Sequence, residues 1–173
     1  PYTDGTVGRT LYTDDRFYEM LKKYAKLDKA LSIHVIGEND LTMIINTIIR
    51  LNNENIKFPK IRLEHCQFMD LETARVIKEM GLIISMQPNF SYDSATYVDR
   101  LHKDYLEKNN PIRMLIDDAG FVSGEDLIFS SDTSINSAKY ALESSLFPPY
   151  EQQRLTLDEF IAGYCMPDNR NGE

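Results

Sequence analysis

The sequence predicts an α/β fold in which parallel strands alternate with crossover helices. Short apolar runs rich in β-branched residues are typical of buried strands. They alternate along the chain with longer stretches whose apolar residues recur every three or four positions, as in amphipathic helices. That alternation favours a parallel sheet whose strands are joined by right-handed crossovers. The length of 173 residues, with apolar residues spread over all of it, corresponds to one domain over residues 1–173.

The N-terminal half contains the most regular pattern. A helix is expected over residues 14–27, because its apolar residues share one face, and Thr13 is its expected N-cap. An apolar strand follows at residues 31–37. Asn39 is expected to cap the next helix, whose apolar stripe runs to an asparagine-rich break, and the second strand covers residues 61–67.

The C-terminal half continues the alternation less regularly. Asp70 is expected to cap the third helix and Gly81 to end it in a left-handed conformation, before a third strand at residues 82–88. Residues 91–109 are helix-like but poorly amphipathic, and a proline then bars a simple continuation of that helix. The remaining expected elements are a turn of helix at 112–119, a strand at 127–132 and helices at 137–146 and 156–164.

Polar residues recur at matching places on successive strands. His34 and His65 are 31 positions apart, and His65 and Asp132 are 67 positions apart. A complete (β/α)₈ barrel takes about 250 residues, so one β/α unit averages about 31 residues and the chain holds between about five and six units. The sequence therefore predicts a partial (β/α)₈ barrel of the TIM type. In such barrels the carboxyl ends of the strands, where these three residues lie, carry the chemistry.

Composition and charge exclude several classes of function. The net charge is −8, from 19 basic and 27 acidic residues, so a nucleic-acid-binding surface of clustered positive charge is not expected. No apolar run approaches the roughly 20 residues that span a bilayer, and the N-terminus has no signal-peptide pattern, so we expect a cytoplasmic protein without a membrane partner. Cys66 and Cys165 form no CxxC pair, which favours reduced, buried thiols.

His34, His65 and Asp132 are the candidate metal ligands. Two imidazoles and a carboxylate from different strand ends can converge on one divalent cation, and these donors suit Zn²⁺, Mn²⁺ or Fe²⁺ better than Ca²⁺ or Mg²⁺. The alternative for each histidine alone is a core residue hydrogen-bonded to the backbone. His102, the remaining histidine, lies among charged residues and is expected on the surface.

Six short segments, in order along the chain, resemble the amidohydrolase superfamily of metal-dependent hydrolases, which are built on a (β/α)₈ barrel. They are DGTVGRT (4–10), SIHVIGEND (32–40), RLEHCQ (62–67), MGLIISMQP (80–88), FSSD (129–132) and RLTLDEFIAGY (154–164). The most similar branch comprises enzymes that cleave the C–N bonds of amides and cyclic amides. The resemblance implies that His34 ends strand five of the barrel, His65 strand six and Asp132 strand eight, so that the chain covers roughly strands five to eight.

The resemblance also implies a role for each of these residues. His34 and His65 would bind a divalent metal, expected to be zinc with one or two ions in the complete protein. Alternatively, His65 would contact the hydrolytic water of a one-metal site. Asp132 would bind metal and transfer a proton from that water to the leaving nitrogen of a small amide-type substrate. Glu64, next to His65, is expected to face the helical layer.

Substrate contacts are expected from two other segments. Asp4 and Arg9 lie in the first matching segment, in a loop after a barrel strand, and such loops face the active site. A glycine-rich turn without contact to the substrate is the alternative there. Gln87 ends the third strand and can hydrogen-bond either the substrate or the end of that strand.

The chain lacks the HxH pair of metal ligands that the first strand of the family supplies. We therefore expect an internal fragment of a larger hydrolase that is inactive by itself. If it is stable alone, it should form a homo-oligomer, because a half-barrel exposes sheet edges and apolar side chains. The alternative from another class is a non-catalytic α/β module that binds a small ligand or a protein partner through the same strand ends.

Overall fold

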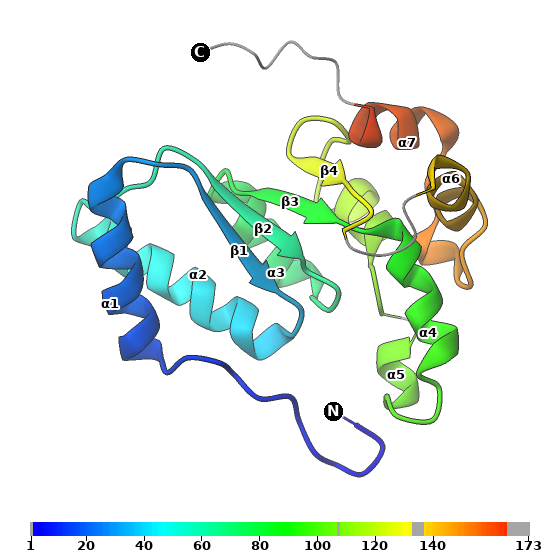
Figure 1. The fold of residues 1–173 in the computed structure, drawn as a ribbon, viewed down its shortest axis with the longest axis horizontal. Coiled ribbons are helices and arrows are strands. Elements are labelled where there is room, and N and C mark those ends of the chain that lie inside the picture. The colour runs from blue at the N-terminus through cyan, green and yellow to red at the C-terminus, as the bar shows by residue number, and fades with distance from the viewer. Residues whose placement is uncertain (1, 107, 133–136, 166–173) are drawn as a thin grey trace.

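A single parallel sheet organises the computed structural model, which describes residues 2–106, 108–132 and 137–165. Its four strands pair in chain order and all run in the same direction (Figure 1). They are β1 (Leu31–Val35), β2 (Ile61–His65), β3 (Ile83–Met86) and β4 (Leu127–Phe129). The α/β class and the parallel strands predicted from the sequence are therefore confirmed.

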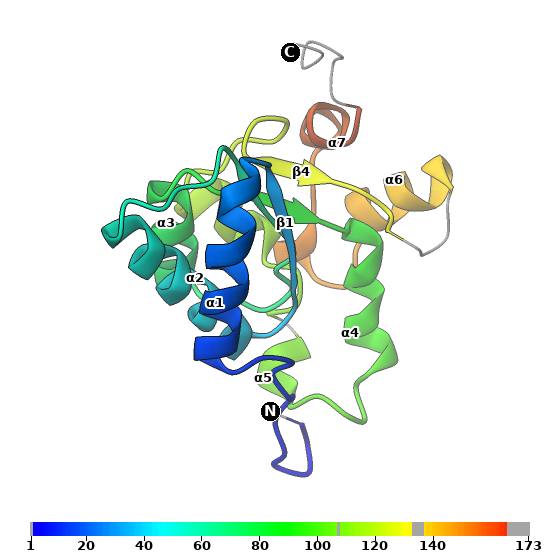
Figure 2. The ribbon, with the colours of Figure 1, turned by 60° about the vertical axis from the view of Figure 1, so that its left-hand side comes forward.

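Three helices from the N-terminal half of the chain cover one face of this sheet (Figure 2). They are α1 (Asp14–Tyr24), α2 (Glu38–Asn53) and α3 (Leu71–Glu79). Alternate strand residues such as Ile33, Val35 and Leu63 are buried in the core that the helices form with the sheet. The crossovers through α2 and α3 lie on the same side, as they do in a (β/α) barrel and unlike the helices of a doubly wound sheet. The described residues thus form a partial barrel.

Short helical segments gather beyond the carboxyl ends of the strands (Figure 1). They are η2 (Pro88–Tyr92), α4 (Asp93–Thr96), α5 (Lys103–Leu106) and the longer α6 (Ala138–Leu146). The other helical segments are η1 (Ala25–Leu27), η3 (Met114–Asp118), η4 (Glu151–Gln153) and α7 (Leu157–Tyr164). The stretch over 91–109 contains short helical pieces instead of one helix, and buried polar side chains connect them: the Asn109 amide donates to the Phe90 carbonyl and to Ser94 Oγ, each at 3.1 Å.

Most of the expected helix boundaries are confirmed by cap geometry. The side chains of Thr13 and Asp70 each accept a hydrogen bond from the backbone N–H three residues on, and Gly81 adopts a φ of +67°. The prediction for Asn39 was wrong: Gly37 is the N-cap of α2, so Asn39 lies in the first turn. An extended glycine serves as an N-cap without a side-chain bond, and it leaves no sequence signal as clear as asparagine.

The prediction that Glu64 faces the helical layer was wrong. Ser32 and Arg62 are paired across β1 and β2, and both donate hydrogen bonds to the Glu64 carboxylate, so these side chains lie on the face opposite the helices. Alternation puts Leu63 toward the helices and Glu64 away from them. The prediction placed Glu64 on the face opposite to His65, on the assumption that β2 is still extended at His65. The backbone of His65 leaves the extended conformation, so the two side chains do not follow this alternation.

Two further expectations concern the cysteines and the membrane. Cys66 is buried as expected, whereas Cys165 is exposed at the end of α7, and neither forms a disulfide. The expected absence of a membrane-spanning helix agrees with the described part of the chain, in which no helix is long and apolar enough to cross a bilayer.

Helix α7 packs closely on β4 through a glycine. A Cβ at Gly163 would overlap the buried ring of Phe129. We expect Gly163→Ala to lower the free energy of unfolding by about 1–3 kcal/mol, because overpacking forces a core side chain from its rotamer. Urea denaturation checks this, with Gly8→Ala as the control because a Cβ there meets nothing within 4 Å. Equal stability of the two variants would contradict the close packing.

Candidate active site

The structure brings the three candidate ligands together at the carboxyl ends of three strands. His34 lies in β1, His65 ends β2, and Asp132 follows β4. The rings of His34 and His65 meet edge to face, with centroids 4.5 Å apart. His65 Nε2 lies 4.0 Å from Asp132 Oδ2. The sequence spacing therefore corresponds to real proximity, although the spacing alone did not fix the distances between the groups.

The backbone adopts a left-handed conformation at the ends of two strands, and this conformation sets the direction of the His65 and Asp132 side chains. The φ angles of His65, Cys66 and Asp132 are 73°, 47° and 49°, values that residues other than glycine adopt infrequently. Each such residue costs on the order of 1–3 kcal/mol and persists only where its surroundings enforce it, which is common at functional sites. At the end of β2, this change of backbone direction places the His65 ring against the His34 ring. The two rings lie on the face of the sheet opposite to the one that Leu63 occupies.

His65 is held on several sides. Its side chain is 9 % exposed, and its ring stacks on Phe90 with centroids 5.9 Å apart. Its Nδ1 lies 2.6 Å from Gln87 Oε1. The Gln87 amide in turn donates to Ser130 Oγ at 2.9 Å and to the Ser85 carbonyl at 3.3 Å. Gln87, predicted to contact substrate, thus has all its polar atoms bonded within the protein, and substrate contact by Gln87 stays a prediction.

Asp132 is more accessible than His65. Its side chain is 41 % exposed. The residue before it is fixed by Asn89, a buried residue of η2 whose amide donates to the Ser131 carbonyl at 3.2 Å. The carboxylate of Asp132 is therefore presented from an anchored backbone toward solvent.

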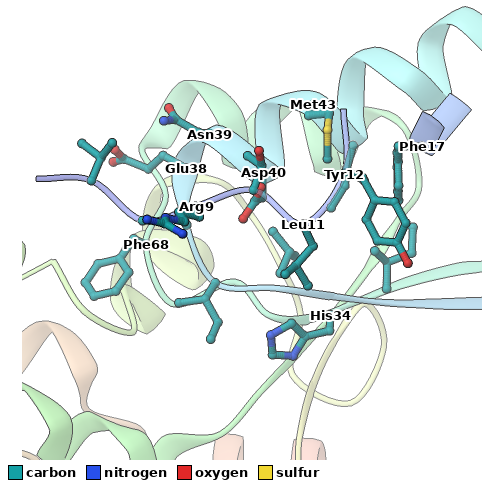
Figure 3. Close-up of a pocket in the computed structure, with 18 of the residues that line it drawn as sticks. Arg9, Leu11, Tyr12, Phe17, His34, Glu38, Asn39, Asp40, Met43 and Phe68 are labelled. Carbon is teal, nitrogen blue, oxygen red and sulfur yellow. The ribbon is translucent and has the colours of Figure 1, made fainter. Parts of the chain in front are cut away.

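The two predicted substrate residues near the N-terminus separate in the structure. Arg9 and His34 line the same cavity of about 800 Å³, which lies between the N-terminal segment, β1 and α2 (Figure 3). Asp4 is not among the residues that line it. Its carboxylate instead accepts hydrogen bonds from the hydroxyl and the backbone N–H of Thr6, which lower the pKa of Asp4. His65, Gln87 and Asp132 also lie outside the lining of this cavity.

Glu64 is a polar residue of this face whose direction was predicted wrongly from the sequence. It is paired in register with His34 on one side and Ser85 on the other. Burial raises the pKa of Glu64, but hydrogen bonds from Ser32, Ser85 and Arg62 lower it more, and the net pKa lies below its ordinary value. The alternation of polar with apolar residues in β1 and β2 was the signal that could have revealed its direction.

The pH dependence of stability tests the charge of Glu64. A lowered folded-state pKa gives stabilisation that is fully present above the ordinary value of 4.5 and is lost as the pH falls through the folded-state pKa. We expect Glu64→Gln to lower the free energy of unfolding at pH 7 by about 1–3 kcal/mol. The difference from wild type should shrink in urea denaturation near pH 3.5. A difference independent of pH, or equal to that of the exposed control Glu19→Gln, would contradict this.

The donors present suit a divalent transition metal, but they are not gathered around one point. Two imidazoles and a carboxylate match the ligands preferred by Zn²⁺, Mn²⁺ and Fe²⁺. Two ligand atoms on one tetrahedral zinc ion are about 3.3 Å apart, slightly less than the separation of His65 and Asp132. Within residues 2–106, 108–132 and 137–165, however, no group of three or more His, Cys, Asp or Glu residues is arranged to hold a metal ion.

Three features define the chain as part of an α/β barrel domain. The strands pair in chain order, the crossover helices lie on one face of the sheet, and His34, His65 and Asp132 lie at the carboxyl ends of the strands. The sequence profile of the Amidohydrolase family matches residues 1–142, and the chain belongs to this family. The resemblance recognised in the sequence is therefore confirmed, and the described fold is part of an amidohydrolase domain. No curated protein matches the chain.

Two solved structures share the fold. An uncharacterized metal-dependent hydrolase from Pyrococcus furiosus superposes with a TM-score of 0.76 at 22 % identity, over 95 % of this chain and 34 % of that one. A second, from Pyrococcus horikoshii OT3, superposes with a TM-score of 0.65 at 20 % identity, over 84 % of this chain and 29 % of that one. The chain thus spans about a third of the length of the solved structures it matches.

Proposed function

We propose that the chain is part of a metal-dependent hydrolase that cleaves amide-type C–N bonds and that it supplies strands five to eight of the barrel. The observation that carries the proposal is the meeting of His34, His65 and Asp132 at the carboxyl ends of β1, β2 and β4. This is the end at which barrels of this kind carry their chemistry. Family membership and the metal-dependent hydrolases with the same fold support it.

His34, His65 and Asp132 are the residues that would hold the metal, for which we propose zinc as one or two ions. When bound, such an ion lowers the pKa of a bound water toward about 7 and polarises a carbonyl oxygen. The missing share of the ligand set would come from parts of the barrel outside this chain. His65 is the most rigid of the three, because its ring is buried, stacked and hydrogen-bonded.

Asp132 is the proposed general base and acid. Its carboxylate, on a side chain that is 41 % exposed, can take a proton from the attacking water and deliver that proton to the nitrogen of the leaving amine as the C–N bond breaks. His65, 4.0 Å from Asp132 Oδ2, is placed to contact that water on its other side. The products are then a carboxylic acid and an amine: one proton of the water is transferred to nitrogen, and the other stays on the new carboxyl group until that group ionises to solvent.

Arg9 is the proposed substrate contact with the best geometric support. It shares a cavity with His34, and Asp40 from α2 faces the same cavity (Figure 3). A small amide-type molecule whose acyl part carries a negative charge would pair with the Arg9 guanidinium. Asp4 and Gln87 remain proposed contacts with less support, and we retain a cytoplasmic, homo-oligomeric protein as part of the proposal.

A non-catalytic binding module is the second candidate, and one observation favours it: the described residues do not group three metal donors around one point. Experiments on the natural protein that contains this chain distinguish the hydrolase from the binding module. We expect the natural protein to bind Zn²⁺ in calorimetric titration and either to release p-nitroaniline from p-nitroacetanilide, a simple anilide, or to open the ring of hydantoin, a cyclic amide. Absence of both zinc binding and hydrolysis, with the protein folded, would favour the binding module.

A further inference from the structure

We propose that Gln87 is a positioning residue that fixes the tautomer of His65. In this arrangement His65 carries its proton on Nδ1, and the lone pair of Nε2 faces Asp132. The inference rests on the proposed function, because a free lone pair at this position matters for holding a metal or a water. It assigns to Gln87 a task other than substrate contact.

The contacts of Gln87 determine which way its amide is turned. The nitrogen lies 3.3 Å from the Ser85 carbonyl oxygen and 2.9 Å from Ser130 Oγ. A carbonyl oxygen can only accept, so the group facing Ser85 must be the NH₂. Turning the amide over would place two acceptors against each other on that side. The oxygen Oε1 is therefore the atom that meets His65.

The orientation of the amide then fixes the proton on the imidazole. Oε1 has no hydrogen, so the 2.6 Å contact with His65 Nδ1 is a hydrogen bond only if Nδ1 is the donor. In the neutral ring Nε2 then has no proton and presents a lone pair. Both side chains are buried, with Gln87 only 2 % exposed, so water cannot readily replace this contact.

The surroundings of Nε2 agree with this assignment. Nε2 and Asp132 Oδ2 face each other at 4.0 Å, which is beyond hydrogen-bonding distance. The Nε2 lone pair and the Asp132 carboxylate are both hydrogen-bond acceptors. Two acceptors that face each other favour a cation or a bridging water between them. His34 and Phe90 contact the His65 ring, so the imidazole cannot rotate away from Asp132. A ligating histidine generally needs a partner of this kind on its other nitrogen.

Nitrogen NMR of metal-free protein tests the assignment directly. The sequence has three histidines, so ¹⁵N-histidine labelling gives three rings, which His65→Ala and His102→Ala assign. At about pH 8.5, where an ordinary histidine is neutral, we expect His65 with protonated Nδ1 and bare Nε2. Gln87→Met, close in shape but without the amide, should move the proton to Nε2, whereas Gln87→Glu should keep it on Nδ1.

The control is Gln67→Met, because Gln67 is also buried at the end of β2 but bonds Asn109 and Asp93 rather than His65. It should leave the His65 tautomer unchanged. A proton on Nε2 in the wild-type protein overturns the proposal, as does a proton that stays on Nδ1 in folded Gln87→Met. If Gln87→Met does not fold, the wild-type and Gln87→Glu spectra decide alone, since a proton on Nε2 in either overturns the proposal.

A zinc titration separates this proposal from the proposed function. We expect Gln87→Met to weaken Zn²⁺ binding by about 10–100-fold, and Gln87→Glu to retain it within a few-fold. A wild-type protein that binds no zinc but shows the expected tautomer contradicts the hydrolase and supports the role of Gln87. A wild-type protein that binds zinc with the proton on Nε2 contradicts the role of Gln87 and leaves the hydrolase standing.

Discussion

Replacing His34 and His65 together with alanine is expected to abolish stoichiometric metal binding by the natural protein that contains this chain. The two rings are in contact at the strand ends, so one double variant removes both proposed nitrogen ligands from the same centre. Of the ligands that this part of the barrel is proposed to supply, only a single carboxylate then remains, because both imidazole donors are gone. Metal analysis of the purified protein, after exposure to Zn²⁺ and removal of excess ion, measures the result.

The third histidine provides the matched control. His102 lies 3.4 Å from Asp104 and its side chain is 49 % exposed, which confirms the predicted surface position. His102→Ala should keep the wild-type metal content. Undiminished metal in the folded His34→Ala, His65→Ala variant would show that these imidazoles are not ligands, and loss of metal in His102→Ala would place the site elsewhere.

The second large effect is expected on the rate of hydrolysis. Asp132→Asn keeps the shape of the side chain but cannot take up the proton of the attacking water. We expect kcat to fall by about 10²–10⁴-fold, which is the usual contribution of a positioned acid or base. The measurement is the steady-state kinetics of whichever probe amide the wild-type protein hydrolyses, with metal content determined in the same samples.

The control for Asp132 is Asp15→Asn on α1, where the side chain is 95 % exposed. Its kcat should equal that of wild type. Because Asp132 is also a proposed ligand, kcat must be compared at equal metal occupancy. An unchanged kcat at equal occupancy, with chemistry shown to limit the rate, would make Asp132 a structural residue.

Local patterns predicted much of the fold. Apolar periodicity located the strands and the main helices, and the caps at Thr13 and Asp70 followed from side chains that bind neighbouring backbone. These features depend on residues within one or two turns of each other. The errors arose where local signals were weak. Gly37 caps α2 without a side chain, and residues 91–109 bury polar groups in place of an apolar stripe.

The candidate site also has one part that could be predicted from the sequence and another part that could not. The repeat of His34 and His65 at one β/α unit predicted that both belong to one end of a barrel, since equivalent positions of parallel strands lie side by side. Spacing could not predict that the backbone of His65 turns left-handed, because that conformation is enforced by the surrounding contacts. For this reason the direction of Glu64 was also predicted wrongly.

By itself the sequence determined the α/β class, the partial barrel, the family and the three residues on which the chemistry is proposed to depend. Only the tertiary structure decided that Gln87 meets His65 and that Arg9 rather than Asp4 shares a cavity with His34. The physical reason is the range of the interactions. Periodicity and capping act between neighbours in the chain, whereas a hydrogen bond between strand ends depends on register, twist and backbone direction in several strands at once.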